Sequence, residues 1–402
     1  MSEGLVRHRS RSPPAPAPLP DDDNMLGEIL IRLPPVPSSL PRASLVCKRW
    51  RRLLSDPQFL RRFRAFHRRR QPPPLLGFFD GFGDTCFTPT LDPPDRVPPA
   101  RFFLQALRRD DGDICNFLCC RHGLVLILNR TRLEITVWDP ISGDQRRVDV
   151  PPGWFHNEDP SLAVRNGALL CDDDEQHGGR VPVESFNVIL LRHDWPVAED
   201  SKAFVSLYEA KTSVWCDLIS IPIKAMVSMN DPSILVGNSL YWLILGYEDS
   251  GILEFDLGRK SLAVIKYPVG AHVTEDSNFQ IVRLEDRLGL AILSVATIQL
   301  WVRKADSVSG WLLQKTIDLD MLLSLRSPVE RSWHVVLGYD EDGHVIFILR
   351  DFQVFMIQLK SMQFRKLFES HFMTVYHPYR SFYVTGRGIG SRDAGAETLN
   401  IM

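Results

Sequence analysis

Four side chains that can bind zinc lie close together in the sequence, at Cys115, Cys119, Cys120 and His122. Structural zinc sites usually take their ligands from two separated Cys-x2-4-Cys knuckles. A β-strand would also point the side chains of Cys119 and Cys120 to opposite faces. We therefore expect no metal at this cluster, and no cofactor elsewhere in the chain.

Two other segments have part of the composition of a ligand site. Residues 173–184 carry acids at both ends, as a calcium loop does, but His177 and Val181 occupy ligand positions and no helices flank the segment. The glycine-rich residues 386–390 follow a predicted strand, but no adequate helix follows them, as a nucleotide site would require. We interpret the first segment as a solvated acidic loop and the second as part of a flexible tail.

No assembled catalytic machinery is visible in the sequence. It contains no Gly-x-Ser-x-Gly elbow, phosphate-binding loop, His-Glu-x-x-His motif or kinase signature. The 7 scattered cysteines indicate free thiols in a reducing compartment. No apolar run approaches the roughly 20 residues of a membrane-spanning helix, and no secretory signal is present. These features favour a non-catalytic protein of the cytoplasm, the nucleus or both.

Helical patterns occupy residues 21–69 and almost no other part of the chain. Acids at 21–23 are placed to cap a first helix, Ser39 to cap a second, and Asp56 with Pro57 to begin a third. Roughly fifty residues of short helices bury too little surface to be secure alone, so their apolar residues predict a partner. The apolar residues at helical spacing are Leu26, Ile29, Leu30, Leu33, Leu45, Val46, Trp50, Leu53, Leu54, Phe59, Leu60, Phe63 and Phe66.

After residue 71 the pattern changes to short β-type runs separated by turns, as the 29 prolines and 25 glycines favour. Similar units recur, each with a glycine turn, a hydrophobic strand and a second strand that ends in an aromatic residue or aspartate. Phe255, Trp301 and Phe355 hold equivalent places in three units, about 45 to 55 residues apart, which is the range of a four-stranded propeller blade. We predict six or seven blades; a large β-sandwich is the competing architecture.

The ordered motifs at 19–20, 28–34, 44–50 and 56–60 resemble the F-box. This resemblance implies docking on a Skp-type adaptor, which links F-box proteins to a cullin scaffold. Gly27 departs from a good helix pattern, where glycine costs about 1 kcal/mol relative to alanine, and this would weaken docking. The resemblance assigns the adaptor-binding surface to Pro20, Ile29, Leu30, Leu33, Pro34, Val46, Cys47 and Trp50.

The remainder resembles the propeller-like associated domain of plant F-box proteins, especially those of grasses. The similar pieces are 73–79, 120–123, 137–140, 241–242, 255–257, 356–364 and 381–383. The two resemblances predict an α+β multidomain protein. Its parts would be a disordered leader (1–18), a three-helix F-box domain (19–70), a kelch-like β-propeller (71–385) and a flexible tail (386–402).

The implied function is that of a substrate-recognition subunit of a Skp–cullin–F-box ubiquitin ligase, whose chemistry occurs on other chains. Loops at one propeller face would bind the protein substrate, with 153–160, 172–182, 222–233 and 268–278 as candidates. One alternative is nucleic-acid binding through the arginine-rich residues 61–70. For these residues we favour a different interpretation, as a solvated helix face or a charged rim along the propeller. Another is a propeller that binds a small ligand.

Overall fold

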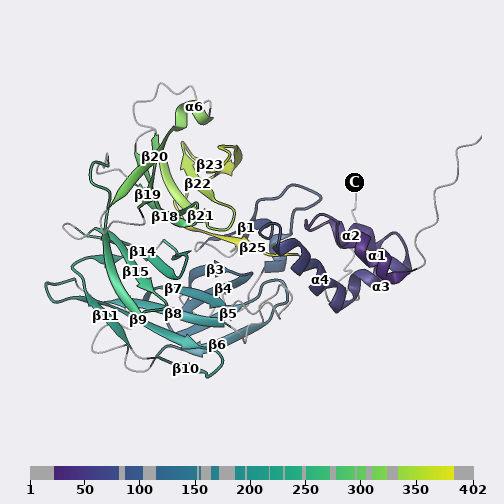
Figure 1. Ribbon diagram of the computed structural model, residues 1–402, viewed down its shortest axis with the longest axis horizontal. Helices are drawn as coiled ribbons and strands as arrows, with labels where there is room; N and C mark the ends of the chain where they lie inside the picture. The colour runs from purple at the N-terminus through teal and green to yellow at the C-terminus, as the bar shows by residue number, and fades with distance from the viewer. Residues whose placement is uncertain are drawn as a thin grey trace, which may run out of the picture.

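The structure is a computed structural model. It describes residues 22–80, 87–102, 115–151, 154, 164–171, 186–194, 197–216, 218–229, 231–246, 250–271, 278–294, 297–304, 310–323 and 334–383. The predicted leader, 1–18, and the predicted tail, 386–402, lie outside these residues. A group of N-terminal helices lies at one end of the long axis of the molecule, and a β-propeller forms the other end (Figure 1).

The N-terminal helices are α1 (Asp23–Leu30), α2 (Ser39–Ser44), α3 (Lys48–Ser55) and α4 (Pro57–Arg68). Asp22 caps α1, where its carboxylate accepts the Asn24 N–H, and Asp56 caps α4 ahead of Pro57, as the sequence predicts. The predicted second helix is two helices. The chain becomes extended at Cys47, whose sulfur accepts the Trp50 N–H, and Ser39 lies inside α2 rather than at its cap.

A small core holds the four helices together and joins them to the far end of the chain. Leu26, Leu30 and Phe63 are buried in it together with Phe382, which follows the last propeller strand. The imidazole Nε2 of the buried His67 lies 3.0 Å from the Ile31 carbonyl oxygen, which connects α4 to the end of α1. The helical domain is therefore packed on the chain segment that leaves the propeller.

Six sheets form the propeller, and their order around the ring follows the sequence. Blade 1 contains β1 (Leu75–Asp80), β2 (Phe87–Pro89) and β25 (Tyr376–Arg380); a short 3-10 helix, η1 (Pro99–Phe102), follows β2. Blade 2 contains β3 (Cys115–Arg121), β4 (Leu124–Asn129), β5 (Glu134–Trp138) and β6 (Gln145–Asp149). Blade 3 contains β7 (Val164–Cys171), β8 (Phe186–His193), β9 (Lys202–Glu209), β10 (Val214–Trp215) and β11 (Ile219–Pro222).

Blade 4 contains β12 (Met226–Val227), β13 (Ile234–Val236), β14 (Ser239–Leu245), β15 (Gly251–Asp256) and β16 (Ser261–Lys266). Blade 5 contains β17 (Asn278–Leu284), β18 (Arg287–Ser294), β19 (Thr297–Arg303) and β20 (Trp311–Asp318), followed by α6 (Leu319–Leu323). Blade 6 contains β21 (His334–Asp340), β22 (Val345–Arg350), β23 (Gln353–Gln358) and β24 (Phe364–Glu369). Phe255, Trp301 and Phe355 fall on β15, β19 and β23, the strands next to the outermost strand of blades 4, 5 and 6, so the repeat predicted from their spacing is confirmed.

Blade 1 closes the ring by pairing the first strand of the propeller with the last. Strands β1 and β25 are antiparallel, and Phe78 stacks on Tyr376 with ring centroids 3.7 Å apart. Blade 6 approaches the same strand closely, because a Cβ on Gly338 would lie 2.4 Å from the Tyr376 carbonyl oxygen. The ring leaves only the short, protected sheet edges of its blades, where an open β-sheet would carry long exposed ones.

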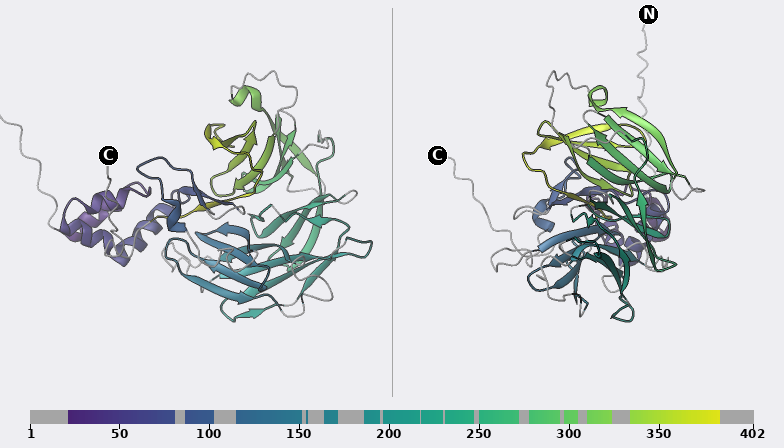
Figure 2. Two further views of the ribbon diagram at one scale, coloured as in Figure 1. Left: turned by 180° about the vertical axis from the view of Figure 1, so that it is seen from behind. Right: turned by 90° about the vertical axis from the view of Figure 1, so that its left-hand side faces the viewer.

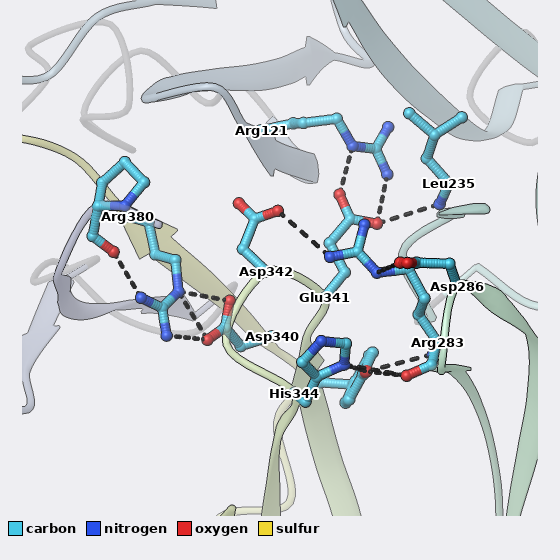
Figure 3. Close-up of polar contacts among 11 residues, drawn as sticks. Arg121, Leu235, Arg283, Asp286, Asp340, Glu341, Asp342, His344 and Arg380 are labelled. Carbon is cyan, nitrogen blue, oxygen red and sulfur yellow. Dashed lines mark hydrogen bonds and ion pairs between the residues drawn. The ribbon is translucent and has the colours of Figure 1, made fainter. Parts of the chain in front are cut away.

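Charged side chains tie the blades together at the ends of the inner strands that face the helical domain (Figure 3). Arg121, at the end of β3, donates to the Leu169 carbonyl of blade 3 and the Ser233 carbonyl before β13, at 3.1 and 3.0 Å. Its Nε and Nη2 also donate to the two carboxylate oxygens of Glu341, at 2.5 and 3.0 Å. Glu341 in turn accepts the Leu235 N–H at 3.0 Å. One ion pair thus connects blades 2, 3, 4 and 6.

Two further pairs complete this cluster. Arg380, at the end of β25, binds Asp340 through Nε and Nη2 and donates Nη1 to the Pro73 carbonyl. The Nη2 atom of Arg283, in blade 5, lies 4.0 Å from the Oδ1 atom of Asp342. Burial would raise the pKa of Glu341, but the adjacent Arg121 outweighs it and holds that pKa below its ordinary value. The Arg121–Glu341 pair is therefore charged, and its role is structural.

We expect Arg121→Ala to lower the free energy of unfolding by about 3–5 kcal/mol, because Glu341 would remain buried without its cation. Urea unfolding followed by tryptophan fluorescence measures this. Arg287→Ala is the matched control, since the Arg287–Glu285 pair, at 3.3 Å, is solvent-exposed and contributes at most about 1 kcal/mol. Equal losses in the two variants would contradict the structural role of Arg121.

Acid should also destabilise the propeller through His377 on β25. Its Nδ1 is buried and has no hydrogen-bond partner among the described residues, and burial lowers its pKa to about 4. An unfolded histidine titrates near 6.5, so the stability is complete above that pH and is lost as pH falls toward 4, by about 2 kcal/mol between pH 7 and pH 5. Urea unfolding at both pH values should show a smaller acid loss in His377→Phe; an unchanged loss would contradict this assignment.

Candidate functional site

An exposed apolar surface occurs on the helical domain, on α1 and on the α2–α3 junction. Ile29 on α1 is 50% exposed and Val46 in the junction is 58% exposed. Met25 and Leu45 beside them are exposed as well. Large apolar side chains are costly to leave in water, so a cluster of them on so small a domain indicates a binding surface.

The eight predicted adaptor-binding residues are placed in three different ways. Ile29, Pro34, Val46 and Cys47 are exposed, Leu33 and Trp50 are half-buried, and Pro20 lies outside the described residues. Leu30 was expected on the surface, but only 1% of it is exposed, because it faces the small helical core. The F-box resemblance assigned Leu30 to the docking surface. The apolar spacing along α1 does not distinguish residues that bind a partner from residues that pack in the helical core.

Ion pairs set α1 against α3 and so bring the two parts of this surface to neighbouring elements. The Asp23 carboxylate on α1 accepts from Arg49 at 2.7 Å and from Arg52 at 2.8 Å, both on α3. The hydrogen bond from Arg49, with the charge of both arginines, lowers the pKa of Asp23 against the opposing effect of desolvation. Gly27 lies between Met25 and Ile29, and a Cβ added there meets no described atom within 4 Å.

The arginine-rich segment forms most of α4. Arg62 pairs with Glu28, and the Arg70 guanidinium lies 3.6 Å from the centroid of the Phe66 ring. Arg64 and Arg68 line a cavity of about 240 Å³ that α4 shares with propeller residues, among them Pro73 and Ser381. Part of this basic helix thus faces the propeller, and Arg61 and Arg69 face solvent.

The propeller has two unlike faces. The inner strands β3, β21 and β25 end at the charged cluster, on the side of the helical domain, and in the right-hand view of Figure 2 the helices lie behind the blades. Loops that precede the inner strands and turns that join second to third strands lie at the other face. Large apolar residues are exposed at this far face, namely Met226, Leu245, Val269, Met321, Phe352, Phe372 and Met373.

The loops predicted to bind substrate are only partly described. Residues 155–163 and 172–185 lie outside the described residues. Residues 222–225 and 268–271 precede inner strands of blades 4 and 5 and belong to the far face, whereas Pro232 and Ser233 lie at the charged cluster on the other face. Sequence analysis missed the turn at Phe352 and the segment at Phe372 and Met373. The sequence does carry a signal for Phe352: an aromatic residue stands in a two-residue turn, where glycine or asparagine is usual.

The cysteines predicted to point apart do so. Cys119 is buried in a core between blades 2 and 3, and Cys120 packs on a core between blades 1 and 2. Burial raises the pKa of Cys119 to about 11, so this thiol is protonated at neutral pH and a poor metal ligand. Within the described part of the chain, no three histidine, cysteine or acidic residues form a group that could hold a metal ion.

No helix among the described residues is long and apolar enough to span a membrane.

Comparison with known proteins matches both parts of the chain. Residues 19–62 match the F-box domain, and residues 116–380 match the family described as F-box protein AT5G49610-like, beta-propeller. The F-box protein At4g17780 of Arabidopsis thaliana is 25% identical over 329 residues, which cover 81% of this chain and 77% of that protein. The F-box/LRR-repeat/kelch-repeat protein At2g27520 of the same plant is 24% identical over 338 residues, 81% of this chain and 83% of that protein.

The solved structures that match this chain share little of its sequence. A streptogramin B lyase is 10% identical, with a TM-score of 0.36 over 73% of this chain and 83% of that one. The family match, by contrast, spans more than half of the chain and includes the strands of five blades. The chain belongs to the F-box proteins with an AT5G49610-like β-propeller.

Proposed function

We propose that this protein is a substrate-recognition subunit of a Skp–cullin–F-box ubiquitin ligase. The F-box helices bind a Skp-type adaptor, and through it a cullin scaffold, while the propeller binds a protein substrate. The observation that carries the proposal is the F-box match at residues 19–62, together with the exposed apolar side chains that α1 and the α2–α3 junction present on that domain.

The arrangement of the two domains supports adaptor binding by the helices and substrate binding by the propeller. Most of the large apolar residues exposed on the described part of the propeller lie on the face away from the F-box, so a substrate there and an adaptor on the helices would not compete. Holding a substrate near a ubiquitin-charged enzyme raises the rate of transfer by increasing its effective concentration. In this proposal the chain contributes binding, other subunits contribute catalysis, and the complex works in the cytoplasm, the nucleus or both.

Replacing Ile29 with aspartate tests adaptor docking. Ile29 is half-exposed, so Ile29→Asp should leave the fold intact while placing a charge in an apolar interface, which should weaken adaptor binding at least about tenfold. Co-purification with a Skp-type adaptor, followed by calorimetric titration, measures the loss. Leu30→Asp is unsuitable for this test because it would place a charge in the helical core.

Val214→Asp serves as the matched control, because Val214 is 56% exposed but lies on β10 of the propeller. It should bind the adaptor as the wild type does. Failure of the folded wild-type chain to bind any Skp-type adaptor would refute the proposed function, and equal binding by wild type and Ile29→Asp would show that the docking surface lies elsewhere.

Gly27→Ala should strengthen α1. Alanine is favoured over glycine inside a helix by about 1 kcal/mol, and the added methyl group meets no described atom. We expect slower hydrogen exchange of the α1 amides and adaptor affinity equal to or above that of the wild type. Faster exchange in the variant would show that a close contact at Gly27 requires glycine.

A further inference from the structure

Phe352 has an unusual position in the far face of the propeller. It shares the two-residue turn between β22 and β23 with Asp351, and both residues have positive φ, 63° for Phe352 and 46° for Asp351. Such turns strongly favour asparagine and glycine, because a side chain with a Cβ is strained in the left-handed region. Phe352 is also 57% exposed. A strained backbone that presents a bulky aromatic ring to solvent indicates a functional constraint.

Neighbouring segments extend the exposed apolar surface around Phe352. Its carbonyl accepts the Ser370 N–H at 2.8 Å, and its ring lies 4.9 Å from the His371 ring. The same segment presents Phe372, 71% exposed, and Met373, 51% exposed. The Ser370 side chain donates to the Phe372 carbonyl and accepts the Phe372 N–H, which fixes the shape of this segment.

A buried arginine connects α6 to the same turn. Arg350, at the end of β22, is 1% exposed and pairs with Asp320 on α6 and with Asp351 in the turn. Met321, next to Asp320, is 80% exposed, and its N–H is held by the Asp318 carboxylate at 2.9 Å. We call Met321, Phe352, Phe372 and Met373 the blade 6 patch. All four side chains are apolar and more than half exposed, and exposed apolar surface of this kind often marks a binding site.

The charge around the blade 6 patch is acidic. The segments 318–321, 350–352 and 369–373 contain Asp318, Asp320, Asp351 and Glu369 against Arg350, and Lys366 on β24 pairs with Glu369 at 3.9 Å, so four acids stand against two bases. The guanidinium of Arg350 is buried among its carboxylate partners and does not reach the surface. A partner that covers this patch therefore meets bulky apolar side chains and a surrounding excess of negative charge, which favours Lys and Arg on its own surface.

We propose that the blade 6 patch binds the substrate protein through a segment in which large apolar side chains are flanked by Lys or Arg. The inference rests on the proposed function, because it assigns the substrate-binding position of the same propeller. Phe352 would be the central anchor, since buried aromatic residues contribute most to the affinity of such interfaces. The strain at its turn is then retained because glycine there would remove the anchor.

Selection from a random peptide library displayed on phage tests this proposal. The library is panned against the purified chain alone and against the chain bound to a Skp-type adaptor. Selected peptides should combine aromatic or aliphatic residues with Lys or Arg, and a synthetic copy should bind more weakly as salt is raised. Phe352→Gly should weaken that peptide at least about tenfold without lowering the urea midpoint, because glycine fits the turn better than phenylalanine.

Asp286→Gly is the matched control, since Glu285 and Asp286 form an equivalent positive-φ turn at the other face, without an aromatic residue. It should leave peptide binding unchanged. The proposal is overturned if no peptide is selected, if acid-rich peptides are selected, if Phe352→Gly binds as the wild type does, or if the patch instead holds a second copy of the chain, seen as a dimer that Phe352→Gly dissociates. Adaptor binding in the same preparations reports the proposed function separately, so the two failures are distinguishable.

Discussion

The ion pair between Arg121 and Glu341 is the contact on which the propeller most depends. Each blade of a propeller touches mainly its two neighbours, so a ring needs contacts that fix distant blades relative to one another. Arg121 supplies them by donating to blades 3 and 6 and to the segment before β13, while Glu341 accepts from blade 4. Such a buried pair is costly to desolvate, and its satisfied hydrogen bonds offset that cost. What it provides is one fixed arrangement of the blades.

This arrangement gives the two faces of the ring different chemistry. At the F-box side Arg380 pairs with Asp340, and the segment that follows the last propeller strand joins the helical domain through Phe382. At the far side, apolar side chains are exposed on loops and turns held by rigid blades. A rigid scaffold with a structural face and a binding face is suited to a protein that holds two partners apart at a defined distance.

Sequence analysis identified both domains because each has a periodic signal. Local backbone geometry determines the helix caps and the blade repeat, and a single sequence is enough to predict such local features. Examples are the caps at Asp22 and Asp56 and the spacing of Phe255, Trp301 and Phe355. The charged cluster was not predicted, because Arg121 and Glu341 are 220 residues apart and meet only after the ring closes. Leu30 was placed on the docking surface by the F-box resemblance, and apolar spacing alone could not correct this because it does not say which side of a short helix meets the core. Phe352 was missed because strand patterns conceal the conformation of a tight turn.

The central claim is that the two faces bind different partners, and hydrogen–deuterium exchange of the chain with and without a Skp-type adaptor tests it most directly. The account predicts slower exchange on adaptor binding in α1 and at residues 45–47, and unchanged exchange at residues 351–352 and 371–373. Protection of the propeller turns by the adaptor, or no protection of the helices in a complex shown to be formed, would contradict it.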